Sequence, residues 1–175
     1  VEEDGIVTTL GKPSSGTASP PPQQTPWGIT RVGGASGTSG LGIKVAVIDT
    51  GIDSTHPDLQ ANIKGSIDFT GSLKGAKDEN GHGTHTAGTI GAVGNNIVGV
   101  VGVNWSVKIM TIKIYDNDGY GTTSAMLVNA YNYVRMMKLR GVNIRVTNNS
   151  YGGCDEACGY DQATKDGIDA MGAAG

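Results

Sequence analysis

One nearly continuous apolar run constrains the fold more than any other feature of this chain. It occupies residues 43–48 (IKVAVI) and ends at Asp49. A β-branched run of this length is typical of a parallel strand that is buried on both faces of a sheet. Similar runs occupy residues 107–115 and 142–147, and residues 123–140 between them carry apolar side chains at helical spacing. This order predicts an α/β fold in which helices flank a mainly parallel sheet.

Polar residues follow the ends of these predicted strands. Ligands of parallel sheets bind beyond the carboxyl ends of the strands, where we expect Asp49 and Ser150. A buried carboxylate is costly unless a partner accepts its charge. Residues 80–92 offer such a partner, because small side chains there allow a helix to start close to the sheet. His82 at that start could serve as a general base, since imidazole titrates near neutral pH.

Four short motifs make the prediction more specific. In chain order they are VIDTGID (47–53), HPDL (56–59), GHGTHTAGT (81–89) and NSYGG (149–153). Their sequence and order closely resemble the subtilisin-like serine proteases, also called subtilases or peptidase family S8. The resemblance implies the three-layer subtilisin-like fold and a serine-type endopeptidase that hydrolyses peptide bonds.

The resemblance also implies roles for individual residues. Asp49 would be the orienting carboxylate and His82 the general base of an Asp-His-Ser triad, whereas His85 would be a packing residue. The family's nucleophilic Gly-Thr-Ser-Met-Ala-type segment and oxyanion-hole Asn do not follow these motifs within the 175 residues. We therefore expect the N-terminal portion of a peptidase domain, incomplete at its C-terminus and inactive by itself.

Two glycine-rich segments resemble the edges between which the family binds an extended peptide as an added strand. They comprise Gly119, Tyr120 and Gly121, and Ser150, Tyr151 and Gly152. Glycine at such positions allows the backbone of a ligand to approach closely. The expected substrate is therefore a peptide or protein.

Residues 93–100 (VGNNIVGV) resemble the calcium loop of the family, in which side-chain and carbonyl oxygens bind a hard cation. The expected ligands of a structural Ca²⁺ are Gln23, Asp58, Gly94, Asn96, Val98 and Val100. A solvated turn without an ion is the alternative.

The N-terminal residues differ in composition from the rest. An acidic start is followed by a stretch rich in Ser, Gly and Pro, which is typical of a semi-extended linker. We predict a propeptide tail and linker over residues 1–22 and the peptidase portion over residues 23–175. Residues 1–4 (VEED) resemble the last strand of the family's inhibitory propeptide, so we expect the protein's own propeptide as a partner of a zymogen. An arbitrary acidic tail is the alternative.

Charge and cysteine content limit the other partners. The formal charge of −3, without a basic run, and the lack of a long apolar stretch argue against nucleic acid and membrane partners. Cys154 and Cys158 could form a local disulfide, remain free thiols or pair with another cysteine. A disulfide would suit a secreted, extracellular protein. We expect a monomer.

Two other functions remain open at this point. A calcium-stabilised pseudoprotease or binding module would keep the fold without the nucleophile. A metal hydrolase that uses Asp49, His82 and His85 is disfavoured, because the Glu of the His-Glu-x-x-His pattern is lacking.

Overall fold

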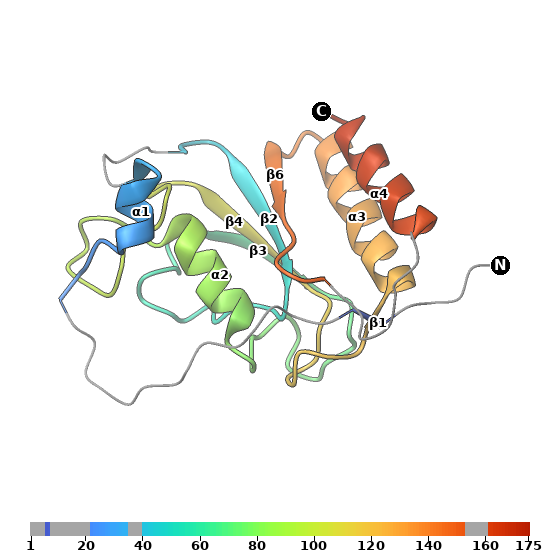
Figure 1. Cartoon of the computed structure of the whole chain (residues 1–175), viewed down its shortest axis with the longest axis horizontal. Coiled ribbons are helices and arrows are strands. Elements are labelled where there is room, and N and C mark those ends of the chain that lie inside the picture. Colours follow the sequence, from blue (N-terminus) through green and yellow to red (C-terminus); the bar gives the residue numbers. More distant parts are fainter. Residues whose placement is uncertain (1–5, 8–21, 35–39, 153–160) are drawn as a thin grey trace.

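A four-stranded parallel sheet forms the centre of the computed structural model, which describes residues 6–7, 22–34, 40–152 and 161–175. The strands are β2 (Lys44–Asp49), β3 (Ile63–Asp68), β4 (Lys108–Lys113) and β6 (Ile144–Asn148). Their order in the sheet is β3-β4-β2-β6, and every neighbouring pair is parallel (Figure 1). The predicted α/β class is therefore confirmed.

Helices lie on both sides of this sheet, which gives three layers (Figure 1). The helices are α1 (Trp27–Arg31), α2 (His82–Gly91), α3 (Ser124–Leu139) and α4 (Gln162–Gly172). α1 and α2 lie on one side, and α3 and α4 lie on the other. The predicted helix at 123–140 is α3, and its N-cap Thr123 accepts a hydrogen bond from the Met126 N–H.

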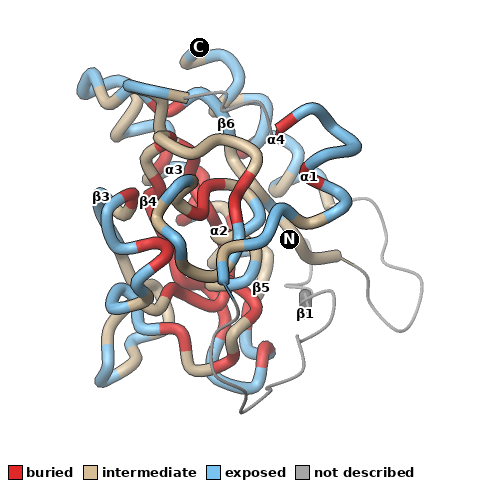
Figure 2. Tube along the Cα trace, turned by 90° about the vertical axis from the view of Figure 1, so that its left-hand side faces the viewer, coloured by how far each residue is buried: buried red, intermediate tan, exposed pale blue. Residues whose placement is uncertain are grey.

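β2 separates two hydrophobic clusters. Val45 and Val47 belong to the cluster that includes Ala87 of α2, whereas Ala46 and Ile48 belong to the cluster on the α3 side. Because both faces of β2 are covered, the strand needs apolar side chains at successive positions. Figure 2 shows the buried residues concentrated in the middle of the molecule.

β3 is an element that the hydrophobic pattern did not predict. Its sequence, IKGSID, is polar, and most of the strand is exposed or half-buried. Among the described strands β3 is at the edge of the sheet, so a partly solvated strand tolerates polar side chains there. Hydrophobic runs therefore identified β2, β4 and β6 and missed β3.

A second, two-stranded sheet joins distant parts of the chain. β1 (Ile6–Val7) pairs antiparallel with β5 (Thr122–Thr123). The rest of the predicted tail up to residue 21 lies outside the described residues, as do Cys154 and Cys158. None of the described helices combines the length and the apolar character needed to cross a bilayer.

Candidate active site

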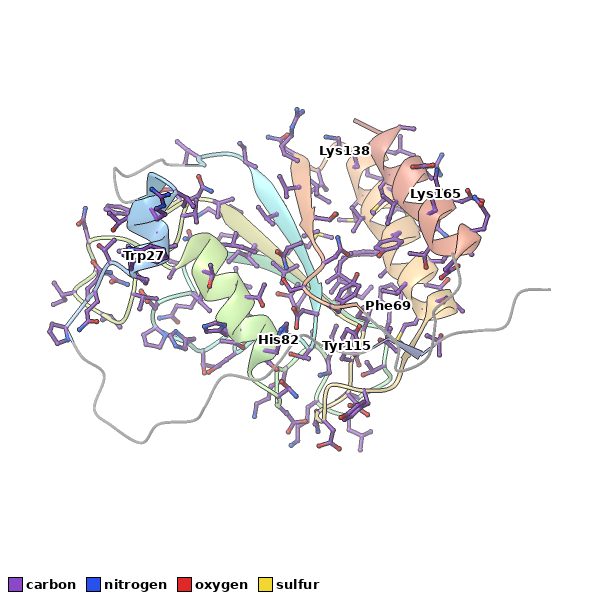
Figure 3. The ribbon with its side chains drawn as sticks, in the orientation of Figure 1. Trp27, Phe69, His82, Tyr115, Lys138 and Lys165 are labelled. Carbon is purple, nitrogen blue, oxygen red and sulfur yellow. The ribbon has the colours of Figure 1, made fainter. Side chains whose placement is uncertain are left out.

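A buried Asp–His pair lies at the carboxyl end of the sheet. Asp49 is the last residue of the central strand β2. His82, labelled in Figure 3, is the first residue of α2. His82 Nδ1 lies 2.7 Å from Asp49 Oδ1. Only 6% of His82 and none of Asp49 is exposed to solvent. Thus the two residues that the sequence singled out are in direct contact.

Glycines allow α2 to start this close to β2. Gly81, the N-cap, has φ +99°, a left-handed conformation that favours glycine. A Cβ on Gly83 would lie 2.3 Å from the Gly51 carbonyl oxygen and 3.2 Å from Asp49 Oδ1. A larger residue at position 83 would therefore push the helix, and His82 with it, away from the strand.

The two oxygens of Asp49 have different surroundings. Oδ1 accepts the Thr50 N–H at 2.7 Å in addition to its contact with His82, whereas Oδ2 is buried and has no donor within the described part of the chain. Burial raises the pKa of Asp49, and the hydrogen bonds from His82 and Thr50 oppose this shift. A proton on Nδ1 suits the carboxylate and leaves Nε2 of His82 as a proton acceptor. The pair is therefore arranged as a general base with an orienting carboxylate.

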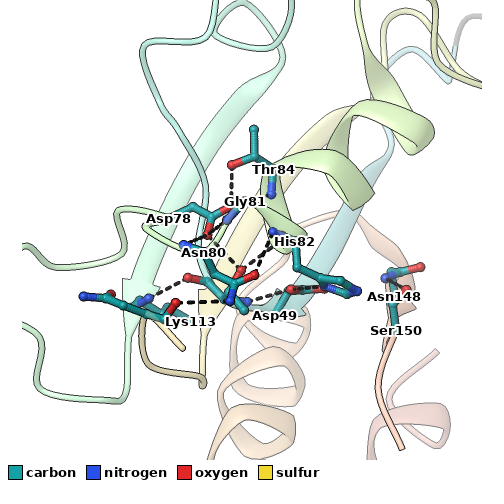
Figure 4. A network of polar contacts seen from close by, with 12 residues as sticks. Asp49, Asp78, Asn80, Gly81, His82, Thr84, Lys113, Asn148 and Ser150 are labelled. Carbon is teal, nitrogen blue, oxygen red and sulfur yellow. Dashed lines mark hydrogen bonds and ion pairs between the residues drawn. The ribbon is translucent and has the colours of Figure 1, made fainter. Parts of the chain in front are cut away.

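Three polar residues that sequence reasoning missed surround this pair. The Thr50 hydroxyl donates to Asp78, and the fully buried Lys113 donates from Nζ to the Thr50 carbonyl at 2.6 Å (Figure 4). Burial lowers the pKa of Lys113, while nearby carboxylates, Asp78 foremost, oppose this shift. The one sequence signal for this cluster is the position of Asp78 just before a predicted helix start, where Asp is favoured.

The first predicted substrate segment forms a turn in this structure. The Tyr120 carbonyl accepts the Asp116 N–H at 3.0 Å, and the Tyr120 N–H donates to Asp116 Oδ1 at 2.9 Å. Gly119 and Gly121 have φ +82° and +84°, respectively. The Tyr120 side chain is 59% exposed. β5 follows directly after this turn.

The second predicted substrate segment follows β6. In Figure 4 the imidazole of His82 points toward the segment that carries Asn148 and Ser150. Ser150 Oγ accepts a hydrogen bond from Asn148 Nδ2 at 2.8 Å. Among the described residues, a Cβ added to Gly152 would meet nothing within 4 Å.

Tyr151 is directed toward other tyrosines. Its ring centroid lies 5.6 Å from that of Tyr115, and its hydroxyl lies 3.2 Å from the Tyr131 hydroxyl. Burial raises the pKa of Tyr151 far above its ordinary value. Tyr115 belongs to the hydrophobic cluster on the α3 side of the sheet, and Tyr151 packs against this cluster.

Four of the six predicted cation ligands are joined by their side chains or backbone. Gln23 Nε2 donates to Asn96 Oδ1 and to the carbonyls of Val98 and Val93, and Asn96 Nδ2 donates to Asp58 Oδ1. The distances from Nε2 to the two carbonyl oxygens are 3.2 and 2.9 Å, respectively. Several oxygens therefore converge on one point, and the Gln23 amide can rotate to add its own oxygen. This donor set fits a hard cation.

The two other predicted ligands have different surroundings. The Val100 N–H donates to Asp58 Oδ2 at 2.9 Å. Gly94 lies against the Trp105 ring, since an added Cβ would be 2.0 Å from a ring carbon. The carbonyl of Val93, which sequence reasoning did not include, is among the oxygens around Gln23.

Clusters of His, Cys, Asp and Glu give no alternative metal centre. Within the described ranges, no group of three or more such residues could hold an ion. His85 is exposed on α2, which differs from the packing role that the resemblance implied, and its backbone N–H donates to the Gly81 carbonyl. The structure therefore offers no support for a metal hydrolase built on His82 and His85.

Comparisons with known proteins agree with the predicted resemblance. The model of the Subtilase family matches residues 40–175. An alkaline protease of Shouchella clausii is 44% identical over 130 residues, which are 72% of this chain and 30% of that protein. Subtilisin amylosacchariticus of Bacillus subtilis subsp. amylosacchariticus is 37% identical over 162 residues, which are 87% of this chain and 40% of that protein. The chain spans less than half the length of these curated relatives.

Proposed function

The chain belongs to the subtilase family, and on that basis we propose that it contributes Asp49 and His82 to the catalytic triad of a serine endopeptidase. The observation that carries this proposal is the 2.7 Å contact between His82 Nδ1 and Asp49 Oδ1 in a buried site at the carboxyl end of the sheet. The nucleophilic serine and the oxyanion-hole Asn of this proposal come from outside residues 1–175.

In the proposed reaction, His82 Nε2 takes the proton of the serine hydroxyl as the serine oxygen attacks the peptide carbonyl. Asp49 holds the Nδ1 proton and stabilises the imidazolium that forms. His82 then gives the proton to the leaving amine, and the acyl group stays on the serine until water removes it. The buried position of the pair excludes competing water from Nδ1 and preserves its orientation.

The proposed substrate is an extended peptide that adds a strand between residues 119–121 and 150–152. The position of β1 supports this part of the proposal. β1 already pairs antiparallel with β5, which begins one residue after Gly121. This edge can therefore accept an added strand, and residues from the tail are candidates to act as a propeptide. Secretion of the protein stays a prediction.

We also propose a structural Ca²⁺ beside the loop at residues 93–100. Asp58 and Asn96 would supply side-chain oxygens, Gln23 its amide oxygen, and Val93 and Val98 their carbonyls. An ion there would tie residues 22–24 to the loop, because it bridges oxygens from both. Its role would be stability, since none of these residues is part of the Asp–His contact.

Two variants of the complete protease test the catalytic proposal. His82→Ala is expected to lower kcat by several orders of magnitude, because triad members act as a unit. His85→Ala, three residues along the same helix, is the matched control and should keep most of the activity, since this His is exposed. The measurement is hydrolysis of a chromogenic peptide, together with stoichiometric labelling by a serine-directed phosphonate. Near-normal turnover by His82→Ala would refute the assignment.

A further inference from the structure

Asp78 lies outside the Asp–His contact, yet it accepts five hydrogen bonds from neighbouring residues. Its Oδ1 accepts the Thr50 hydroxyl at 2.9 Å and the backbone N–H groups of Asn80 and Gly81 at 3.1 and 2.9 Å. Its Oδ2 accepts the Thr84 N–H at 2.8 Å and the Thr84 hydroxyl at 2.6 Å. The residue is only 9% exposed. A carboxylate with this many donors is held in one place.

One set of these bonds fixes the start of α2. The first N–H groups of a helix lack partners within the helix, and the N-cap Gly81 has no side chain to bind them. Asp78 accepts N–H groups from Gly81 and Thr84, which precede and follow His82. Its negative charge also suits the positive end of the helix dipole. Asp78 therefore caps α2 from outside the helix.

The other bond fixes the end of β2. Thr50 donates its N–H to Asp49 Oδ1 and its hydroxyl to Asp78. The same hydroxyl oxygen accepts the Gly83 N–H at 2.9 Å. Thr50, which follows Asp49, and Gly81 and Thr84, on either side of His82, thus all donate to the carboxylate of Asp78.

We propose that Asp78 is the positioning residue of the Asp–His pair, holding His82 against Asp49 through Thr50 and the first turn of α2. The inference rests on the proposed function, because positioning matters for catalysis only if the pair is catalytic. Asp78 is not a catalytic residue in this proposal, since its hydrogen bonds go to neighbours of the pair. Its contribution would be a fixed distance and angle between the imidazole and the carboxylate.

The positioning role requires the charged form of Asp78. Burial by itself would raise the pKa of Asp78, but hydrogen bonds from Thr84, Gly81 and Thr50 outweigh it and lower the pKa. In the described part of the chain, the groups that hydrogen-bond to both carboxylate oxygens are all donors. An amide in the same position would direct its NH₂ group at donors whichever way it turned. Asp78→Asn therefore keeps the size of the side chain but loses the hydrogen bonds of at least one of the two oxygens.

The test observes the proton on His82 Nδ1 directly. In the full chain, a proton held between Nδ1 and the Asp49 carboxylate should give a low-field NMR resonance, assigned by ¹⁵N-histidine labelling and its loss in His82→Ala. Asp78→Asn is expected to broaden or abolish this resonance while the circular dichroism spectrum stays native. Asp68→Asn is the matched control, because Asp68 also accepts hydrogen bonds from a threonine N–H and hydroxyl but caps a different loop. An unchanged resonance in Asp78→Asn would overturn the proposal.

Thr50 provides a second pair of variants in case Asp78→Asn does not fold. Thr50→Val removes the hydroxyl that links Asp78 to Gly83 and should weaken the resonance, whereas Thr50→Ser retains the hydroxyl and should restore it. Equal spectra for these two variants would count against the link.

Activity separates this inference from the proposed function. In the complete protease, Asp78→Asn should lower kcat about tenfold to hundredfold with little change in KM, as expected for a misplacement of about 1 Å. An inactive wild-type protease with a normal resonance would refute the catalytic proposal and leave the positioning role intact. If Asp78→Asn lost the resonance but kept a normal kcat, this result would refute the positioning role.

Discussion

Gly83 offers the sharpest test of how α2 meets β2. An added Cβ would lie 2.3 Å from the Gly51 carbonyl oxygen, about 1 Å short of an ordinary van der Waals contact. The carbonyl is backbone and cannot rotate away, so Gly83→Ala requires a movement of the helix or the strand. Overpacking of this kind typically costs about 1–3 kcal/mol of the free energy of unfolding.

Gly88 provides the matched control in the same helix. An added Cβ there would meet nothing within 4 Å. Gly88→Ala is therefore expected to stabilise the chain by about 0.5–1 kcal/mol, because alanine has the higher helix propensity. The same substitution should thus have opposite signs at two positions five residues apart.

The assay is thermal unfolding of the full chain, followed by circular dichroism. For a domain of this size, 1 kcal/mol corresponds to about 2–4 °C in Tm, so the Tm values of the two variants should differ by about 3–16 °C. Urea unfolding gives the same comparison as a free energy. If Gly83→Ala is as stable as Gly88→Ala, then the first turn of α2 does not lie against Gly51, and the account of the site is wrong.

Three further predictions concern other parts of the molecule. Asp58→Ala should lower Tm more in calcium than in excess chelator, because a bound ion stabilises only the state that binds it, whereas the hydrogen bonds of Asp58 are lost in both conditions; equal losses would count against an ion bound by Asp58. The lowered pKa of Asp78 gives stability that is present above the ordinary value of 3.8 and is lost as the pH falls through the lowered pKa, so Asp78→Asn should flatten the acid limb of the stability curve. Ile112→Ala should cost about 2–5 kcal/mol in urea unfolding, since this side chain is completely buried. A cost within error of zero would contradict its place in the core.

The sequence predicted three of the four described strands of the parallel sheet and missed β3. β2 is buried on both faces, so its apolar run carries a strong signal, whereas the half-solvated β3 has a polar sequence without one. The contact between Asp49 and His82 followed from motifs. The support from Thr50 and Asp78 did not, because hydrogen bonds between residues far apart in the chain depend on tertiary contacts that no local pattern encodes.

The loop at residues 93–100 shows a different limit of prediction from sequence. Asn95 and Ile97 both have φ near +60°, the left-handed region that non-glycine residues seldom adopt. Which carbonyls point inward depends on these dihedral angles and not on residue type. The sequence therefore indicated the loop but did not predict the carbonyl of Val93, which lies near the Gln23 amide.

The parallel sheet has a kinetic consequence. Among the described strands of this sheet, no two form a hairpin. Of the paired strands, β3 and β4 are the nearest in sequence, and they place Ile63 opposite Ile109. β2 pairs Lys44 with Ile144 of β6. Each ladder requires the closure of a long loop before its first hydrogen bond forms, so such topologies have high contact order and fold slowly. During that delay the β-branched run of β2 is exposed to other chains. The yield of refolding after dilution from denaturant should therefore fall as the chain concentration rises, even where the folded state is stable.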